Sequence, residues 1–187
     1  MRVRLAGAAL AASMLGASGA LADDPYIPGL YTVINYSGAF PSYKKVPTIS
    51  FPSELDGVEA DIGWRFNRFY SVEASYSYFE GQKNANGQSL TSELQDGSID
   101  ALGYLPFGYS SPWALYADVG GTYYFASAHT VTLSTGNEST FGARVGGGLQ
   151  YMIDEDLGVR LSGRYDWADL THVRAATVFA VGLVWQR

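Results

Sequence analysis

The residues of this chain that could do chemistry are charged side chains at alternating positions within otherwise apolar segments. They are Glu59, Asp61, Arg65, Glu73, Asp100, Asp118, Arg144, Arg160, Arg164 and Asp166. Closely spaced carboxylates can act as a general acid and a general base. The sequence indicates neither a nucleophile nor a substrate cleft beside them, so we expect no catalytic residue. Two interpretations remain, a network of ion pairs that fills an interior and the charged lining of a narrow pore, and we favour the first.

An alternation of apolar and polar residues places these charges on one face of β-strands. It is clearest between residues 141 and 167, where Val145 and Leu149 share one face and Arg144 lies on the other. A period of two over runs of this length is typical of strands with one apolar and one polar face. The same pattern predicts strands at about 29–38, 57–66, 70–78, 94–107, 113–125, 141–151, 157–167 and 175–187.

Long polar segments and short turns alternate between these predicted strands. The long segments are residues 39–56, 80–93, 126–138 and 168–174, and the short turns are residues 67–68, 108–112 and 152–156. This alternation is the connectivity of an antiparallel up-and-down barrel. We therefore predict an all-β fold, with eight antiparallel strands in one up-and-down β-barrel.

The direction of the apolar face distinguishes a soluble barrel from a membrane barrel. Its aromatic residues gather near the short turns, at Trp64, Phe66, Tyr70, Phe107, Trp113, Tyr151 and Trp185, and near the long segments, at Tyr78, Tyr123, Phe141 and Trp167. Two such girdles are typical of the two interfaces of a bilayer. Lys44, Lys45 and Lys83 fall in predicted loops, whereas a soluble sheet carries lysine on its exposed face. We therefore predict a transmembrane barrel, with a soluble lipocalin-like barrel as the alternative.

The first residues of the chain have the pattern of an export signal. Two arginines precede an uncharged apolar run over residues 5–17, and Ala20-Leu21-Ala22 is a small-x-small cleavage site. The apolar run is shorter than the ~20 residues that a membrane-spanning helix needs. We predict a secretory signal peptide over residues 1–22 and one barrel domain over residues 23–187. The net charge of −6 argues against nucleic acid as a partner.

The charges of the polar face are predicted to meet across the lumen. Between the sixth and seventh strands we expect Arg144 to face Arg164, which is unfavourable unless acids neutralise both. Glu73 is expected close to Asp100, which repeats the problem with the opposite sign. Strands on opposite sides of the barrel would bring the two clusters together. The predicted lumen ion-pair network consists of Glu59, Asp61, Glu73, Asp100, Asp118, Arg144, Arg160 and Arg164.

The last predicted strand ends in Gly182-Leu183-Val184-Trp185-Gln186-Arg187. A glycine followed by an aromatic residue resembles the assembly signal that ends small outer-membrane β-barrel proteins. That family includes the transmembrane domain of OmpA, OmpX and the opacity-type surface proteins of Gram-negative bacteria. Gly182 and Trp185 match the signal, whereas Arg187 stands where the family usually has a terminal aromatic residue. The resemblance covers residues 23–187 and rests on the signal peptide, the strand number and the alternation of loops.

This resemblance implies a protein of the Gram-negative outer membrane with both termini in the periplasm. The implied partners are outer-membrane lipid, lipopolysaccharide and the barrel assembly machinery. A surface ligand is expected at loops 39–56, 80–93 and 126–138, since function on such scaffolds often resides in loops. The expected function is non-enzymatic, in envelope integrity or surface interaction, and the alternative is a narrow, porin-like diffusion channel.

Metal, cofactor and enzymatic chemistry are not expected. The two histidines, His129 and His172, fall in predicted loops, and a metal site needs more ligands than these. Outer-membrane lipid deacylases use a histidine and a serine on one strand near the bilayer surface, and no predicted strand contains a histidine. The absence of cysteine excludes disulfides and thiol chemistry.

Overall fold

The computed structural model describes residues 26–43, 54–85, 88–130, 134–168 and 173–186. Within them the chain forms eight strands, β1 (Gly29–Tyr43), β2 (Leu55–Asn67), β3 (Tyr70–Ala85), β4 (Gln88–Pro106), β5 (Trp113–Thr130), β6 (Ser134–Met152), β7 (Leu157–Ala168) and β8 (Val173–Gln186). In these ranges no helix is long and apolar enough to cross a membrane. The predicted signal peptide over residues 1–22, and also Arg187, lie outside the described residues.

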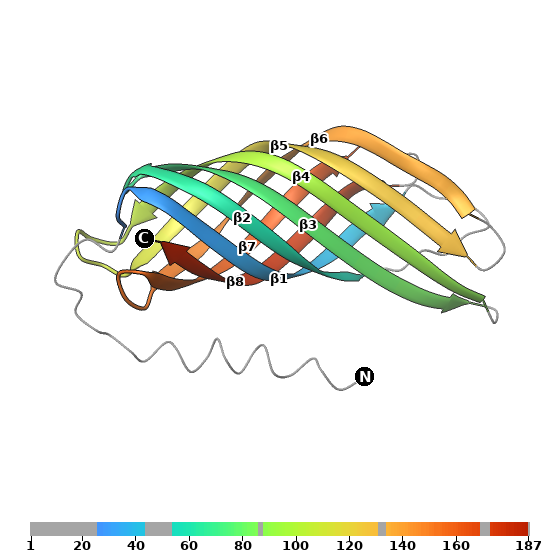
Figure 1. The fold of residues 1–187 in the computed structure, drawn as a ribbon, viewed down its shortest axis with the longest axis horizontal. Coiled ribbons are helices and arrows are strands. Elements are labelled where there is room, and N and C mark those ends of the chain that lie inside the picture. Colours follow the sequence, from blue (N-terminus) through green and yellow to red (C-terminus); the bar gives the residue numbers. More distant parts are fainter. Residues whose placement is uncertain (1–25, 44–53, 86–87, 131–133, 169–172, 187) are drawn as a thin grey trace.

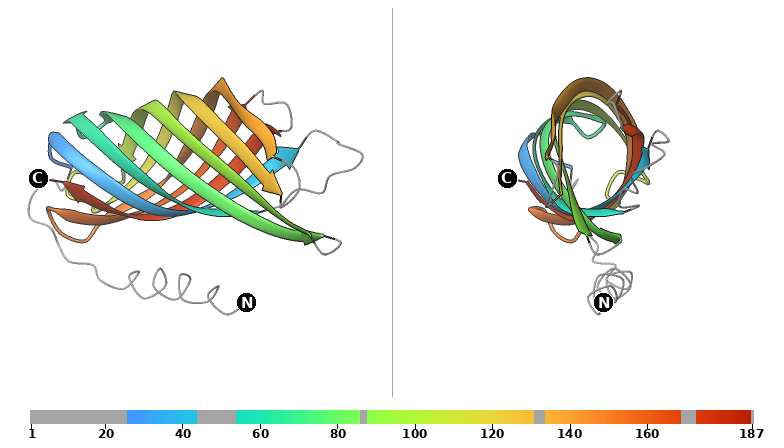
Figure 2. Two further views of the ribbon diagram at one scale, coloured as in Figure 1. Left: turned by 45° about the vertical axis from the view of Figure 1, so that its right-hand side comes forward. Right: turned by 90° about the vertical axis from the view of Figure 1, so that its right-hand side faces the viewer.

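The strands close into one antiparallel barrel. Each strand pairs with the next along the chain, and β1 pairs with β8 to complete the ring. Figure 1 shows the strands crossing the barrel at a steep tilt, and the end-on view in Figure 2 shows the closed ring. Closure pairs the backbone groups that an open sheet edge would expose, as a lipid environment requires. The prediction of an eight-stranded up-and-down barrel is confirmed.

The predicted long loops are partly wrong, because the strands continue beyond the alternating segments. β3 and β4 remain paired as far as Ala85 and Gln88, and Figure 1 shows this hairpin reaching beyond β1 and β2. Residues 80–93 and 126–138 are therefore mostly strand, and the start of 39–56 belongs to β1. Beyond the bilayer both faces of a strand meet water, so backbone pairing continues there without an apolar alternation.

The first short turn differs from the prediction by one residue. β2 ends at Asn67 and β3 begins at Tyr70, so Arg68 and Phe69 form the turn. The side-chain oxygen of Asn67 accepts hydrogen bonds from the backbone N–H groups of Phe69 (2.8 Å) and Tyr70 (3.0 Å). An asparagine that bonds its own backbone in this way stabilises a tight turn.

The predicted pairing of β6 with β7 is wrong. Arg144 lies opposite Asp166, and Arg164 lies opposite Gly146, so the two arginines do not face each other. The unfavourable contact in the predicted register is replaced by a cross-strand pair of opposite charge.

The turn between these two strands explains the difference. Oδ1 of Asp154 accepts hydrogen bonds from the backbone N–H groups of Asp156 (2.9 Å) and Leu157 (2.7 Å). The backbone N–H of Ile153 donates to the carbonyl oxygen of Leu157 (2.8 Å). The hairpin therefore closes later in the chain than predicted. When the pairing register of two strands shifts by two residues, every side chain stays on its own face. The alternation of apolar and polar residues therefore did not reveal the correct register.

The apolar face of the strands points away from the lumen. Ile34, Ile62 and Ile99 are 70%, 60% and 66% exposed, whereas Glu59, Asp61 and Asp100 on the opposite face of β2 and β4 are buried. Most residues of the two predicted girdles are exposed on this outer face, namely Trp64, Phe66, Tyr70, Phe107, Phe141, Trp167 and Trp185. Tyr151 is covered by Trp113, whose ring centre lies 4.5 Å away. This is the arrangement of a membrane barrel and not of a soluble one.

Candidate functional site in the barrel lumen

Side chains fill the lumen in three layers. Nearest the long loops lies an apolar layer of Ala39, Leu55, Phe79, Leu94, Tyr124, Ala168, Ala176 and Val178. The middle layer holds most of the charged residues. Nearest the short turns lies a tyrosine-rich layer of Tyr26, Leu102, Tyr104, Ala114, Tyr116 and Met152. The middle layer, called here the charged layer, is the candidate site because it contains the predicted network.

Arg144 of β6 reaches past β5 to the acids of β4. Its guanidinium donates two hydrogen bonds to the Asp100 carboxylate, and the bond from Nε measures 2.6 Å. Nη2 also donates to the hydroxyl of Ser75 (3.1 Å), and Nη1 lies 3.6 Å from Oδ1 of Asp96. Two parallel hydrogen bonds to one carboxylate are among the strongest contacts that an arginine makes.

Arg160 of β7 crosses the lumen to β3. Its Nη1 donates to Oε1 of Glu73 (2.7 Å), and Nη2 donates to the Tyr104 hydroxyl (3.1 Å) and to Oε1 of Gln150 (3.1 Å). Glu73 also accepts a hydrogen bond from the hydroxyl of Tyr31 (2.6 Å). Arg160 and Glu73 are both buried, and each carries more than one partner, as a buried charge requires.

Arg164 of β7 forms its ion pair with Glu59 of β2, also across the lumen. Its Nε lies 3.3 Å from Oδ2 of Asp166, two residues further along the same strand. Glu59 accepts a further hydrogen bond from the Ser77 hydroxyl (2.7 Å). Three arginines from β6 and β7 thus bind three acids from β2, β3 and β4.

Glu73 and Asp100 lie opposite each other in the ladder of β3 and β4, as the sequence predicted. Each of these facing acids binds an arginine from outside the β3–β4 hairpin, Arg160 of β7 and Arg144 of β6 respectively. Repulsion between the two carboxylates on neighbouring strands is therefore offset by contacts that only the closed ring allows.

Two residues of the predicted network form no ion pair with an arginine in the described part of the chain. Asp61 accepts a hydrogen bond from Nδ2 of Asn35 (2.9 Å), which also donates to Glu59 (3.1 Å). Asp118 lies beside Gly146 and, like Asp61, forms no ion pair with an arginine among the described residues. The charged layer therefore contains more acids than arginines.

Asp96 and Asp166 belong to the charged layer, although the predicted network omits them. Both are buried, and each lies within 4 Å of an arginine nitrogen, at 3.6 Å and 3.3 Å respectively. The alternation carries the signal for both, since Asp96 has the same parity as Asp100 and Asp166 the same parity as Arg164. Asp96 lies next to the predicted boundary between a loop and a strand, where that signal is weakest.

Glycines on the polar face provide the space that the charged layer occupies. A Cβ atom at Gly120 would overlap the carboxylate of Asp100, and one at Gly146 would lie 2.7 Å from Cβ of Arg164 and 2.9 Å from the carboxylate of Asp118. A narrow barrel can accommodate arginine side chains only if the facing positions are small.

The space left between these side chains is small. A cavity of about 30 Å³ remains within the charged layer. Its lining includes the three ion-pairing arginines, Ser162, and the two acids without an arginine partner, Asp61 and Asp118. A cavity of this size holds only one or two water molecules.

Arg65 lies in the tyrosine-rich layer and was not part of the predicted network. Its guanidinium carbon lies 4.5–5.1 Å from the ring centres of Tyr26, Tyr31 and Tyr104. Nη1 donates to Oε1 of Gln186 (3.3 Å). Tyr26 precedes β1 and is only 1% exposed, and its hydroxyl donates to the carbonyl oxygen of Pro112 (2.8 Å). Tyr26 thus helps to fill the short-turn end of the lumen, which no strand pattern could indicate.

The prediction that His129 lies in a loop is wrong. His129 belongs to β5, where it pairs with Thr91 of β4 and Ser134 of β6. The argument that no strand contains a histidine therefore fails, and the expectation of no enzymatic activity loses that support. His172 lies outside the described residues. Within the described ranges no three His, Cys, Asp or Glu side chains are grouped so as to hold a metal ion.

Gly182 and Trp185 occupy opposite faces of β8. Trp185 is 60% exposed on the outer face, whereas Gly182 faces the lumen, where a Cβ atom would overlap the side chain of Asn35. Gly182 therefore has a packing role, whatever role the two residues have during assembly.

Known structures share this fold at low sequence identity. Neisserial surface protein A superposes with a TM-score of 0.67 at 16% identity, covering 85% of this chain and 97% of that one. OprG from Pseudomonas aeruginosa gives 0.65 at 12% identity (87% and 98% covered), and Ail, the attachment invasion locus protein of Yersinia pestis, gives 0.59 at 16% (85% and 99%). No curated protein matches by sequence. The model of the outer membrane protein beta-barrel domain matches residues 6–186, and the chain therefore belongs to that family.

Proposed function

We propose that this outer-membrane barrel is non-enzymatic, has a sealed lumen, and serves envelope integrity or surface interaction through its loop end. The observation that carries the proposal is the filling of the lumen by three layers, with a cavity of about 30 Å³ in the charged one. A pore for hydrated solutes needs a continuous water-filled path. The cross-lumen ion pairs of the charged layer act in this proposal as an internal brace.

A narrow diffusion channel is the second candidate, and the acid excess favours it. The charged layer contains Glu59, Asp61, Glu73, Asp96, Asp100, Asp118 and Asp166 against Arg144, Arg160 and Arg164. If the arginines moved aside, the ring of acids that remained would attract cations. A channel of this kind would be selective for cations.

Conductance in planar bilayers separates the two candidates. We expect no steady conductance from the wild type and a cation-selective conductance from the Arg144→Ala, Arg160→Ala double variant. Arg174→Ala is the control. Arg174 is exposed at the loop end, so this substitution removes an arginine that lies outside the lumen. Heat-dependent gel mobility establishes that each variant is folded. Steady conductance of the wild type would refute the sealed lumen.

For the surface role we propose a ligand that binds through loops 39–56, 80–93 and 126–138. This end of the chain carries charges of both signs, with the acids Glu54 and Glu80 and the bases Lys83 and Arg174. Ail has been solved with the heparin analogue sucrose octasulfate, so sulfated polymers are one class of ligand to test. Exchange of the three loops, followed by binding assays with cationic and sulfated polymers, tests the proposal. Binding that persists unchanged after all three loops are exchanged would contradict it.

The remaining proposals concern export, assembly and catalysis. Residues 1–22 are proposed as a signal peptide, and Gly182 with Trp185 as the signal for the barrel assembly machinery in a membrane of lipid and lipopolysaccharide. Outer-membrane fractionation of wild type and Trp185→Ala tests both, with slower assembly expected for the variant.

Fatty-acid release from lipopolysaccharide by the wild type, abolished by His129→Ala, would contradict a non-enzymatic function.

A further inference from the structure

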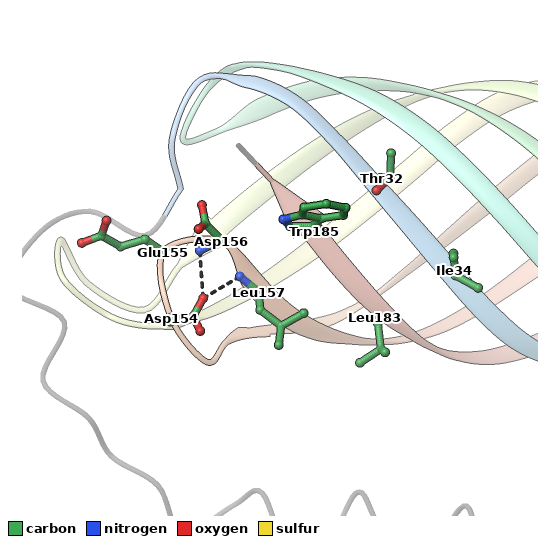
Figure 3. Close-up of a pocket in the computed structure, with 8 residues that line it drawn as sticks. All are labelled: Thr32, Ile34, Asp154, Glu155, Asp156, Leu157, Leu183 and Trp185. Atoms are coloured by element: carbon green, nitrogen blue, oxygen red, sulfur yellow. Dashed lines mark hydrogen bonds between the residues drawn. The ribbon is translucent and has the colours of Figure 1, made fainter.

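A groove opens on the outer wall where β1 meets β8, beside the turn that joins β6 to β7. Its volume is about 800 Å³. It is lined by Thr32, Ile34, Leu157, Leu183, Trp185 and the turn residues Asp154, Glu155 and Asp156. Figure 3 shows the three acids at one end of the groove and Ile34 and Leu183 towards the other.

The floor of the groove is apolar and belongs to the lipid-facing wall. Ile34, Leu183 and Trp185 are 70%, 53% and 60% exposed, so no other part of the described chain covers them. In a membrane barrel such a floor is covered by acyl chains. Trp185 lies close to the acidic turn, and an indole at that height is typical of the level of the lipid headgroups.

The acidic end of the groove is held rigidly. The carboxylate of Asp154 accepts two backbone N–H groups within the turn, as described above. Gln186 of β8 holds the same turn from outside, since its backbone N–H donates to the carbonyl oxygen of Asp156 (2.8 Å) and its side-chain amide to that of Glu155 (2.9 Å). The side-chain carboxylates of Glu155 and Asp156 have no partner among the described residues, and none of the described residues that line the groove is basic.

Charge selects among the molecules that could cover this groove. An anionic lipid headgroup would be repelled by three carboxylates, and a second copy of the chain related by twofold symmetry would bring two acidic turns together. A chelated metal ion is disfavoured, because the described residues contain no group of three ligands arranged for one. A protonated primary amine suits the site, since it is a compact positive charge with three hydrogen-bond donors.

We propose that the groove binds an aminophospholipid of the phosphatidylethanolamine type. The acyl chains cover Ile34 and Leu183, and the ammonium group bonds to the carboxylates of Glu155 and Asp156 beside Trp185. Short turns of outer-membrane barrels lie on the periplasmic side, so the lipid belongs to the periplasmic leaflet. The inference needs only membrane location and does not depend on whether the lumen conducts.

The test measures which lipid stays bound to the full, folded barrel. Native mass spectrometry of the detergent-solubilised protein is titrated with phosphatidylethanolamine, phosphatidylcholine and phosphatidylglycerol of identical acyl chains. We expect phosphatidylethanolamine to bind about tenfold more tightly than phosphatidylglycerol, which corresponds to about 1.4 kcal/mol. Phosphatidylcholine, whose quaternary amine donates no hydrogen bond, is expected between the two.

A charge-matched pair of variants shows whether the turn is responsible. Glu155→Gln with Asp156→Asn removes the two carboxylates and leaves Asp154, which holds the turn, in place. The control is Glu80→Gln with Asp56→Asn, an exposed facing pair near the loop end that loses the same charge. We expect the turn variant to lose about tenfold in phosphatidylethanolamine affinity and the control to lose none. Equal binding of all three lipids by the wild type, an unchanged turn variant, or an equal loss in both variants would overturn the proposal.

Discussion

Replacing Arg144 by methionine should destabilise the barrel by about 4 kcal/mol. Methionine keeps an unbranched side chain but removes the two hydrogen bonds to Asp100 and the bond to Ser75. It also leaves Asp100 and Asp96 buried without a cation, in a layer that already has more acids than arginines. Removal of one partner from a buried ion pair typically costs about 3–5 kcal/mol, because the other charge stays buried and uncompensated.

A double-mutant cycle with Asp100→Asn separates this pair from its surroundings. Asp100→Asn alone should cost less, about 2 kcal/mol, because Arg144 keeps Asp96 at 3.6 Å. The double variant should cost less than the sum of the single variants, by about 2–3 kcal/mol, since neither charge is then left without its partner. Each value comes from equilibrium unfolding in urea of protein folded into thin lipid bilayers, followed by tryptophan fluorescence and gel mobility.

Arg174→Met is the control substitution. It removes an arginine from the exposed start of β8 and should change the free energy of unfolding by less than about 0.5 kcal/mol. If Arg144→Met cost less than about 1 kcal/mol, or if the two substitutions were additive, the charged layer would not act as a brace. The ion pairs would then be a consequence of the fold without a measurable part in its stability.

Two further predictions concern residues that pack the lumen. Tyr26→Ala should cost about 3 kcal/mol, because a buried aromatic side chain is lost and Arg65 loses one of its rings. Tyr26→Phe keeps the ring and removes the hydroxyl that donates to Pro112, so it should cost about 1 kcal/mol. The same urea unfolding measures both, and equal costs would contradict a packing role for the ring. Gly120→Val should lower the yield of folded barrel, since its Cβ would overlap Asp100, while Gly121→Val, which points to open space, should not. Refolding into vesicles scored by gel mobility tests this, and equal yields of the two variants would contradict it.

The strands and their two faces were predictable because the side-chain period in a strand is two. That pattern identifies Glu73, Asp100 and Arg144 as residues of one polar face, and the aromatic girdles identify lipid as the environment of the other. Where the strands pass beyond the bilayer the pattern stops, since water lies on both sides. The sequence therefore predicts a loop where β3 continues to Ala85.

The alternation of residue types along the chain thus indicates which residues share a face and which environment each face meets. Tertiary structure decided their partners. A two-residue shift preserves every face, so only the turn at Asp154 placed Arg144 opposite Asp166 and not opposite Arg164. Contacts across the lumen, such as Arg160 with Glu73, depend on the stagger with which the ring closes, and no local pattern encodes that stagger.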